Sequence, residues 1–501
     1  MKTINFEAKY LKDAQLFYKE YCHNDHSILF ESAEITEKSG VQSIIGVSTA
    51  LKISCENLVV KAEALNNNGL ALLQKLASIF KKDIKNQAID IKFQRPPKNL
   101  DEITRLKAPG PLDVIRQLRL LVTDCKDILI AGVIAFDFIN NFENIGTVPK
   151  GENSCDDYCY YLCDIAILVN HIGKTTSVVA YAFADNTYKD TAFKALELQS
   201  ALNDFKLQDN LVINIKRKPQ INTDLSDDEF SKIVGRLKEH IINGDAFQVV
   251  PSRTFSYPCK DPLKAYSYLK KLNPSPYMYY IKDPRYTIFG ASPEFALRFN
   301  AKTREVAISP IAGTRARGID EFGKLDKELD SRIELELRTD NKEISEHLML
   351  VDLARNDLAR IAKAGSRYVD NLLHVDKYQS VMHLVSDVRA TLREDLDAFH
   401  AYLACMNMGT LSGAPKIKAH ELIYRYEGKK RGSYGGVINL ISADGSFNSC
   451  IAIRTAFVKN QTAYVQAGCG VVFDSDIASE CQETVNKALS VLTALDLTLE
   501  D

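Results

Sequence analysis

Short strand-like segments, several joined by short loops, constrain the second half of this 501-residue chain more than any other feature. They are rich in β-branched and aromatic residues and alternate with helical patterns, which is typical of antiparallel sheets packed with helices. We therefore predict an α+β fold with large mixed, mainly antiparallel sheets. The runs are FQVVPSRTF, YTIFGASPEFALRF, GGVINLISA, CIAIRTAFV and TAYVQAG.

A polar, proline-containing segment before Ser226 reads as a linker between two parts of the chain. Ser226 and Glu229 have the spacing of a capping box, so they predict the start of a helix. Gly244 is placed to end that helix. We predict two domains, 1–220 and 221–501, and the second carries most of the glycine-rich and charged motifs.

Composition excludes several classes of protein. A formal net charge of −2 and a pI near 6.5 give no broad attraction to nucleic acid or to an anionic membrane. No stretch approaches the roughly 20 apolar residues that span a bilayer, and the N-terminus has no apolar signal region.

Eleven scattered cysteines indicate free thiols in a reducing cytoplasm. Cys155, Cys159 and Cys163 share one face of a predicted strand, which favours core thiols over a metal site.

The segment EISEHLMLVDLARNDLARI has apolar residues almost all around a helical wheel, so we expect a buried helix. It nevertheless carries Glu343 and Glu346, which lie three positions apart and hence on one face. A second segment, SECQETVNKALSVLTAL, begins with a predicted capping box of Ser479 and Gln482. Its two acidic residues, Glu480 and Glu483, have the same spacing, and the helix N-terminus favours their charged forms.

Four carboxylates brought together repel one another unless a cation lies between them. Oxygen ligands alone suit Mg²⁺, which commonly keeps waters and shares its shell with an anionic substrate. Each pair taken singly is more often a solvated helix face. The apolar surroundings of the first pair shift the balance towards a metal site.

Arg454 is the only charged residue in CIAIRTAFV, and a buried guanidinium needs an anionic partner. A structural ion pair and a substrate carboxylate are equal candidates. The nearby glycine-rich turn, Gly468 to Gly470, could bind an anion through its backbone amides. His383, in an apolar stretch, is more often a core histidine than a catalyst.

Ordered motifs along the second half resemble the chorismate-utilising enzymes, most closely the anthranilate synthase component I, or large, subunits. The motifs are PIAGTRARG, EISEHLMLVDLARNDLARI, MNMGTLSGAPK, KRGSYGG, IAIRTA and QAGCGVVFDSD followed by ETVNKA. The resemblance implies a lyase of tryptophan biosynthesis, which converts chorismate and ammonia to anthranilate and pyruvate. It also implies sheets around a central chorismate cleft, with the first domain holding part of a regulatory site.

The resemblance assigns roles to residues at matching positions. Glu346 and Glu483 match Mg²⁺ ligands, supported by Glu343 and Glu480. Glu294 matches the general acid that protonates the departing hydroxyl, and His383 and Thr410 match residues near the reacting ring. We expect His383 to serve the elimination of pyruvate. The chorismate-binding positions are Gly313, Thr314, Tyr434, Arg454, Gly468, Cys469 and Gly470.

Two positions separate this chain from the relatives with other activities. Aminodeoxychorismate synthases have a lysine nucleophile where this chain has Ala312. Isochorismate and salicylate synthases have a lysine that activates water where this chain has Gln248. An amide cannot deprotonate water, but ammonia attacks without deprotonation. Both substitutions favour anthranilate synthase over the alternative within the same class, aminodeoxychorismate synthase component I. The intact acidic set, Glu294 and Arg454 argue against a non-catalytic regulator that binds chorismate or tryptophan.

The resemblance also implies a partner and a feedback inhibitor. Ammonia would come from glutamine through a separate glutamine amidotransferase subunit, often within a heterotetramer. LFESAEI and NPSPYMYY match the site for inhibitory tryptophan, although Gln42 replaces a lysine often found after the first motif. The tryptophan-binding residues would be Glu31, Ser32, Pro276, Tyr277 and Met278.

Overall fold

Two antiparallel sheets share two long strands in the computed structural model, which describes residues 1–32, 42–207, 211–215, 219–320, 324–378 and 381–499. The shared strands are β3 (Gln42–Glu56) and β7 (Tyr158–Asn170), which pair from end to end. Their register shifts between Gly46 and Leu51. Extra residues of this kind bend a strand, so each half of β3 and β7 belongs to a different sheet.

The first sheet contains the N-terminal half of β3 and the C-terminal half of β7. Its order is β1-β8-β7-β3-β2-β11-β12-β21-β22-β10. The other strands are β1 (Lys2–Ala8), β8 (Thr175–Ala182), β2 (Ser27–Glu31), β11 (Tyr277–Asp283), β12 (Tyr286–Ser292), β21 (Thr455–Lys459), β22 (Thr462–Gly468) and β10 (Ser252–Pro258).

The second sheet contains the other halves of the shared strands. Its order is β5-β4-β3-β7-β6-β19-β20-β13-β14-β17-β16, and β15 pairs with β17 beyond β14. The strands are β5 (Ala88–Lys92), β4 (Val59–Ala64), β6 (Leu129–Ile134), β19 (Val437–Ile441), β20 (Phe447–Ile451), β13 (Phe295–Phe299), β14 (Glu305–Ile308), β15 (Ile311–Ala316), β16 (Tyr368–Lys377) and β17 (Val381–Thr391).

Every strand pair within the described residues is antiparallel, including the small pair β9 (Gln248–Val249) and β18 (Gly413–Ala414). The prediction of an α+β fold built on large, mainly antiparallel sheets is confirmed.

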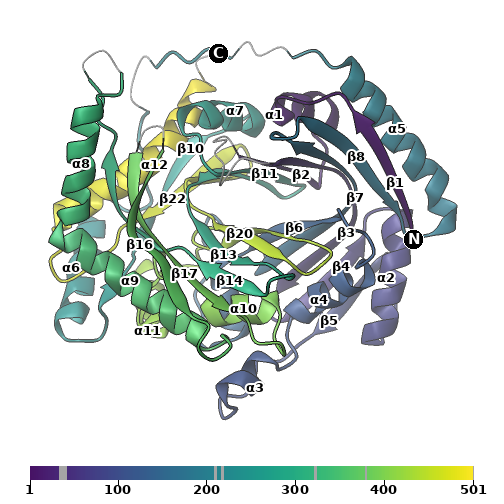
Figure 1. The fold of residues 1–501 in the computed structure, drawn as a ribbon. Coiled ribbons are helices and arrows are strands. Elements are labelled where there is room, and N and C mark those ends of the chain that lie inside the picture. Colours follow the sequence, from purple (N-terminus) through teal and green to yellow (C-terminus); the bar gives the residue numbers. More distant parts are fainter. Residues whose placement is uncertain (33–41, 208–210, 216–218, 321–323, 379–380, 500–501) are drawn as a thin grey trace.

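The two sheets pack face to face, and helices cover their outer faces (Figure 1). Apolar residues of both sheets, among them Ile281, Val133 and Cys159, form the inner layer. Cys163 lies there too, and Cys155 packs against it, so the prediction of core thiols is confirmed. The first sheet is covered by α1 (Ala14–Phe17), α5 (Tyr188–Asp204), α7 (Pro262–Leu272) and α12 (Ile477–Leu497).

The second sheet packs its outer face against the other large hydrophobic cluster. Helices that contribute to this cluster are α2 (Asn67–Phe80), α4 (Leu112–Leu121), α6 (Asp227–Ile242), α9 (Asn341–Ala359), α10 (Ala398–Cys405) and α11 (Lys416–Glu427). The remaining α-helices of the described residues are α3 (Glu102–Leu106) and α8 (Lys327–Thr339).

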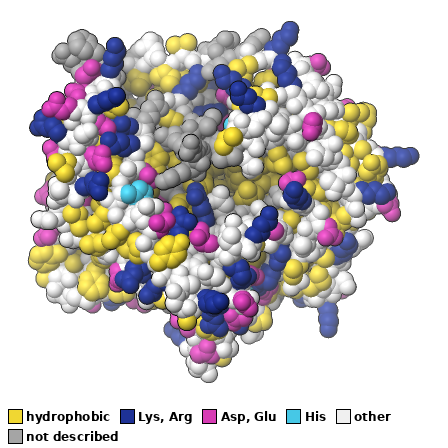
Figure 2. All heavy atoms as spheres, viewed as in Figure 1, with side chains coloured by type: hydrophobic (Ala, Val, Ile, Leu, Met, Phe, Trp, Pro, Cys, Tyr) yellow, Lys and Arg dark blue, Asp and Glu magenta, His cyan; other side chains and the backbone are white. Residues whose placement is uncertain are grey.

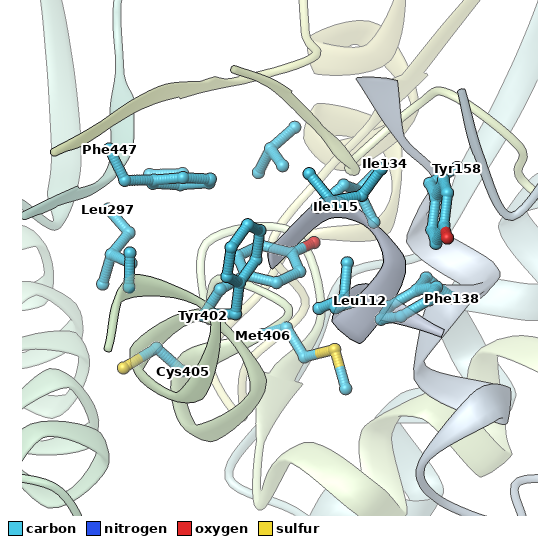
Figure 3. Packing of buried hydrophobic residues seen from close by; sticks show 14 of the residues in the cluster. Leu112, Ile115, Ile134, Phe138, Tyr158, Leu297, Tyr402, Cys405, Met406 and Phe447 are labelled. Carbon is cyan, nitrogen blue, oxygen red and sulfur yellow. The ribbon is translucent and has the colours of Figure 1, made fainter. Parts of the chain in front are cut away.

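The core is continuous across the predicted domain boundary near residue 220. Figure 3 shows Leu112 and Phe138 in the same cluster as Tyr402 and Met406. Two strand ladders also join the two parts, β2 with β11 and β6 with β19. The parts therefore share both sheets, and their division into two domains stays a prediction.

Two helix predictions need correction and one is confirmed. The helix α9 was expected to be buried, but it lies outside the sheet and buries one face only, so Leu348 is 41% exposed. The helix α12 begins at Ile477 because Asp476, not Ser479, caps it. The capping box of Ser226 and Glu229 is present, and α6 ends before the turn at Gly244.

Charged side chains of both signs are interspersed over the face shown in Figure 2, as the small net charge predicts. Among the helices that the structure describes, none has the length and apolar character to cross a membrane. All eleven cysteines are without disulfide bonds.

Candidate active site

Glu294 and Arg454 lie on two adjacent segments where the chain crosses from one sheet to the other. Glu294 connects β12 to β13, and Arg454 connects β20 to β21. Backbone hydrogen bonds join the crossings, because Ile451 N–H donates to Glu294 O and Ala291 N–H donates to Arg454 O, each at 3.1 Å. The fold thus places a carboxyl group and a guanidinium group at the same edge of the two sheets.

The Glu294 carboxyl group is buried and accepts a side-chain hydrogen bond. Thr410 Oγ1 donates a hydrogen bond to Glu294 Oε1 at 3.1 Å. Burial raises the pKa of Glu294 to about 8, against the opposing effects of Thr410 and Arg454. The group therefore holds its proton at neutral pH and can act as a proton donor. It lines a small pocket together with Thr410, Met408 and Leu350 of α9.

Arg454 has a left-handed backbone, with φ 52°, and its side chain is partly buried. Burial lowers the pKa of its guanidinium, and Tyr434, Glu483 and Glu294 act in the opposite direction. No carboxylate of the described residues forms an ion pair with it. A structural ion pair, one of the two predicted explanations, is therefore not found in this part of the chain, which favours an anionic ligand.

His383 and Thr314 face each other across the pair β15–β17. They are register partners, and Thr314 Oγ1 lies 2.8 Å from His383 Nδ1. Burial, assisted by the positive charge of Arg454, lowers the pKa of His383 to about 4. The imidazole is therefore neutral at physiological pH, and a neutral imidazole can accept a proton. His383 is buried, as predicted, but it has a polar partner in the site.

The glycine loop packs against Tyr434 and Gln248. A β-carbon on Gly468 would lie 2.9 Å from the Tyr434 hydroxyl, and one on Gly470 would lie 3.2 Å from Gln248 Nε2. Gln248 Oε1 is buried and has no hydrogen-bond partner among the described residues. The prediction that all three loop amides are available to an anion is wrong for Cys469, because its N–H donates to Pro251 O at 3.1 Å.

The two acidic pairs repel one another, although Glu346 and Glu483 are 137 residues apart in the sequence. Burial raises the pKa of Glu346 to about 7, and Glu343, Glu480 and Glu483 raise it further, against Lys342. Burial also raises the pKa of Glu480, and Glu483 adds to this effect. Such mutual effects require the first turns of α9 and α12 to lie near each other, as predicted from the sequence.

The carboxylates differ in their other partners. Glu343 Oε1 accepts from Arg315 at 2.7 Å, and Glu483 Oε1 pairs with Lys487 at 2.5 Å. Glu346 Oε1 and Glu480 Oε2 are buried and have no hydrogen-bond partner in the described part of the chain. Lys342 Nζ forms an ion pair with Glu346 Oε1 at 3.8 Å, and both oxygens can still accept a cation.

The donor set fits a hydrated Mg²⁺. This ion usually takes one or two protein carboxylates and completes its shell with water and substrate oxygens. No group of three or more Asp, Glu, His or Cys side chains within the described residues is arranged to hold a metal. Glu346 and Glu483 stay the predicted ligands, and the buried, unbonded Glu480 Oε2 adds Glu480 as a further candidate.

Sequence reasoning missed two basic residues of the site. Lys487 Nζ contacts Glu483 and also donates to Gly468 O at 3.0 Å, so it links α12 to the glycine loop. Its position four residues after Glu483 was a visible signal. Arg315, in the motif PIAGTRARG, bonds Glu343 and Asp340. Only the contact with α9 reveals its partner.

The predicted tryptophan-binding residues come together through the pair β2–β11, in which Glu31 and Met278 are register partners. Glu31 is buried and accepts from Tyr266 at 2.8 Å and Lys270 at 2.9 Å. The Tyr277 hydroxyl contacts Arg298 and Asn448. Ser32 and Pro276 extend from the ends of these strands, and residues 33–35 of the first motif lie outside the described residues.

Comparison with known proteins places this geometry in a family. The sequence pattern described as "chorismate binding enzyme" matches residues 71–493. The chain belongs to the chorismate-binding enzymes. Similar proteins include anthranilate synthase component 1 of Vibrio parahaemolyticus, 43% identical over 99% of this chain and 93% of that protein. The Escherichia coli protein of the same name is 44% identical over 99% and 97%.

A solved structure has the same fold as this chorismate-binding enzyme. Anthranilate synthase component I from Streptococcus pneumoniae aligns with a TM-score of 0.70 and 28% identity, over 92% of this chain and 93% of that one. The resemblance to anthranilate synthase component I that the motifs indicate is confirmed.

Proposed function

We propose that this chain is the large subunit of an anthranilate synthase, which converts chorismate and ammonia to anthranilate and pyruvate in tryptophan biosynthesis. The observation that carries the proposal is the buried, protonated Glu294 on a crossing next to Arg454, whose guanidinium has no ion pair among the described residues. The relatives named anthranilate synthase component 1 support the same activity.

Chorismate carries two carboxylates, and the site offers two regions that suit them. Arg454, with the Tyr434 hydroxyl nearby, suits one carboxylate through charge-assisted hydrogen bonds. The region between Glu346 and Glu480 suits the ring carboxylate through Mg²⁺. When bound there, Mg²⁺ would stabilise negative charge that develops in the ring. Gly313, Thr314 and the loop from Gly468 to Gly470 would frame the ring.

In the amination step, ammonia attacks ring carbon C2, and a C–N bond forms while the C4–O bond breaks. Hydroxide is a poor leaving group, so Glu294 gives its proton to the departing oxygen, which leaves as water. Thr410 holds the Glu294 carboxyl group in place. Ammonia keeps its lone pair without a base, and Gln248 Oε1 can accept one of its N–H groups. The new ammonium group then loses one proton.

In the elimination step, C2 loses its proton and the C3–O bond breaks, so the ring becomes aromatic. The side chain leaves as the enolate of pyruvate, which takes up a proton on its terminal carbon to give pyruvate. Burial lowers the pKa of His383 to about 4, so the imidazole is neutral and its unprotonated ring nitrogen can accept that proton, and a nearby anionic substrate favours the protonated form. The contact with Thr314 fixes the orientation of the ring.

The remaining parts of the proposal concern partners and regulation. The designation of the relatives as component 1 supports a second component, which we propose to be a glutamine amidotransferase subunit in a heterotetramer. Tryptophan would inhibit by binding at Glu31, Ser32, Pro276, Tyr277 and Met278. Eleven unpaired cysteines support a cytoplasmic location.

One assay separates this activity from its alternatives. The purified chain is incubated with chorismate, Mg²⁺ and ammonium at mildly alkaline pH, where free ammonia is present. Anthranilate fluorescence supports the proposal. An aminated product that keeps its pyruvyl group would identify an aminodeoxychorismate synthase, and absence of turnover would identify a non-catalytic binding protein.

A further inference from the structure

An ion pair with almost no solvent exposure lies behind the loops of the site. Arg431 and Glu427 have side chains that are 0% and 2% exposed. Arg431 Nε donates to Glu427 Oε2 at 2.9 Å, and Nη2 bonds the other carboxylate oxygen. Removing two charges from water is costly, and the pair alone does not offset that cost unless further hydrogen bonds satisfy both groups.

Those further bonds all go to segments that carry site residues. Arg431 Nη1 donates to Leu411 O at 2.8 Å, directly after Thr410. Arg431 Nη2 donates to Val250 O at 2.6 Å, two residues after Gln248. The guanidinium also lies 5.5 Å from the centre of the Tyr434 ring. One side chain therefore contacts three segments of the site, those that contain Val250, Leu411 and Tyr434.

The carboxylate of the pair extends the contacts to a fourth segment. Glu427 Oε1 accepts from both the amide and the hydroxyl of Ser252, each at 2.8 Å. Gln466 Nε2 donates to that same hydroxyl at 2.8 Å. Gln466 lies in β22 two residues before Gly468, where the glycine loop begins. Loss of the carboxylate would thus loosen this strand end as well.

We infer that the Arg431–Glu427 pair is a positioning device, which sets the distances between Gln248, Thr410, Tyr434 and the glycine loop. The inference rests on the proposed function for the identity of the ligand, but the positioning itself does not. A guanidinium has five donors in a fixed plane, so its bonds to two carbonyls and one carboxylate fix relative orientation as well as distance. Lysine cannot reproduce this planar fork.

A second buried ion pair provides a matched control. Lys52 Nζ bonds Asp283 between the two sheets, and their side chains are 10% and 0% exposed. Tyr161 also donates to Asp283, at 2.7 Å. None of these residues lies in a segment that carries a predicted catalytic or chorismate-binding residue. Asp283→Asn therefore disturbs a buried charge to a similar extent without disturbing the site loops.

The experiment compares Glu427→Gln, Arg431→Lys and Asp283→Asn in the full chain. Amide hydrogen exchange is measured first, since it needs no ligand. We expect Glu427→Gln and Arg431→Lys to increase exchange together in segments 248–252, 409–412, 432–436 and 466–470, and Asp283→Asn to leave these segments unchanged. Increased exchange confined to residues near 427–431, or equal changes in Asp283→Asn, would overturn the inference.

Steady-state kinetics supply the second readout. We expect the KM for chorismate to rise about tenfold in Glu427→Gln and Arg431→Lys, while Asp283→Asn keeps the wild-type KM even if its melting temperature falls. An unchanged KM in folded Glu427→Gln would contradict the inference. If that variant does not fold, Ser252→Ala removes a single donor to Glu427 and should show the same changes to a smaller extent. A wild-type chain without turnover would refute the proposed function, and hydrogen exchange would still decide the positioning role.

Discussion

Glu294 and Arg454 lie on adjacent crossings between the two sheets, and backbone hydrogen bonds of 3.1 Å tie each crossing to its neighbour. Neither residue has an ion pair with the other. Glu294 is instead kept neutral by burial, and Arg454 remains positively charged. This relationship provides a proton donor and an anion-binding group at fixed separation, which is what protonation of a leaving group on an anionic substrate requires.

Replacement of Glu294 by Gln should abolish the proton donor while keeping the side-chain shape. We expect kcat to fall by roughly 10²–10⁴-fold, the usual contribution of a general acid. With free ammonia held at a constant concentration, wild-type kcat/KM should fall as pH rises through about 8, where the Glu294 carboxyl loses its proton. A variant with wild-type kcat would contradict the assignment.

Glu294 also makes stability depend on pH. Its pKa is raised from 4.5 to about 8 in the folded chain, so the folded state holds a proton that the unfolded state has lost between these values. Its contribution to the free energy of unfolding should be greatest below pH 4.5 and fall by about 1 kcal/mol per pH unit up to pH 8. Denaturant titrations at several pH values give the free energy of unfolding of wild type and of Glu294→Gln. As pH rises, the advantage of the wild type in this free energy should shrink, and at high pH the variant should be the more stable protein.

Arg454→Met tests whether the guanidinium serves a ligand or the fold. A partly buried charge without an ion pair among the described residues contributes little to folding, so the melting temperature should be retained or raised. The KM for chorismate should rise at least about tenfold, because a charge-assisted carboxylate contact is lost. Arg253 is the matched control, since it is buried and bonded to Thr484 and Asp227. Arg253→Met should lower the melting temperature instead.

The acidic residues should govern the response to Mg²⁺. Glu483→Gln should fold normally and need a higher Mg²⁺ concentration for half-maximal activity, while chelation of the ion should inactivate the wild type. Glu346→Gln removes the carboxylate that the others repel, so it should raise the metal-free melting temperature. Wild-type activity that survives chelation, or an unchanged Mg²⁺ requirement in Glu483→Gln, would remove the metal assignment.

The regulatory prediction is tested by Ser32→Ala, which should relieve inhibition by tryptophan and leave kcat unchanged. Glu31→Gln is a less suitable variant, because Glu31 also accepts from Tyr266 and Lys270 and its loss should lower stability. Inhibition curves at fixed chorismate concentration check the first variant. Unaltered inhibition in Ser32→Ala would argue against this pocket.

Strand content, antiparallel pairing and the convergence of the acidic helices followed from local patterns. Periodicity and short loops indicate antiparallel strands wherever they occur. The doubling of E-x-x-E likewise pointed to two helices that share one ligand. The strand and helix patterns are local in sequence, whereas the approach of the two acidic helices was inferred from the repulsion that four carboxylates would otherwise suffer.

Features that depend on distant contacts could not be predicted. The bend that divides β3 and β7 between two sheets arises from register shifts near Ser48, which no motif marks. The exposed face of α9 follows from its position outside the sheet. The Cys469 amide is bonded to Pro251, next to the isolated bridge between Val249 and Val471. Arg431 joins segments that are distant in the sequence through its bonds to Leu411 and Val250, so its positioning role becomes visible only in the folded chain.

The most direct test measures anthranilate and pyruvate together in wild type and Glu294→Gln, with chorismate, Mg²⁺ and ammonium supplied. The account predicts equal amounts of the two products from the wild type and almost none from the variant. Wild-type protein that forms no anthranilate, or a variant that forms it at the wild-type rate, would contradict it.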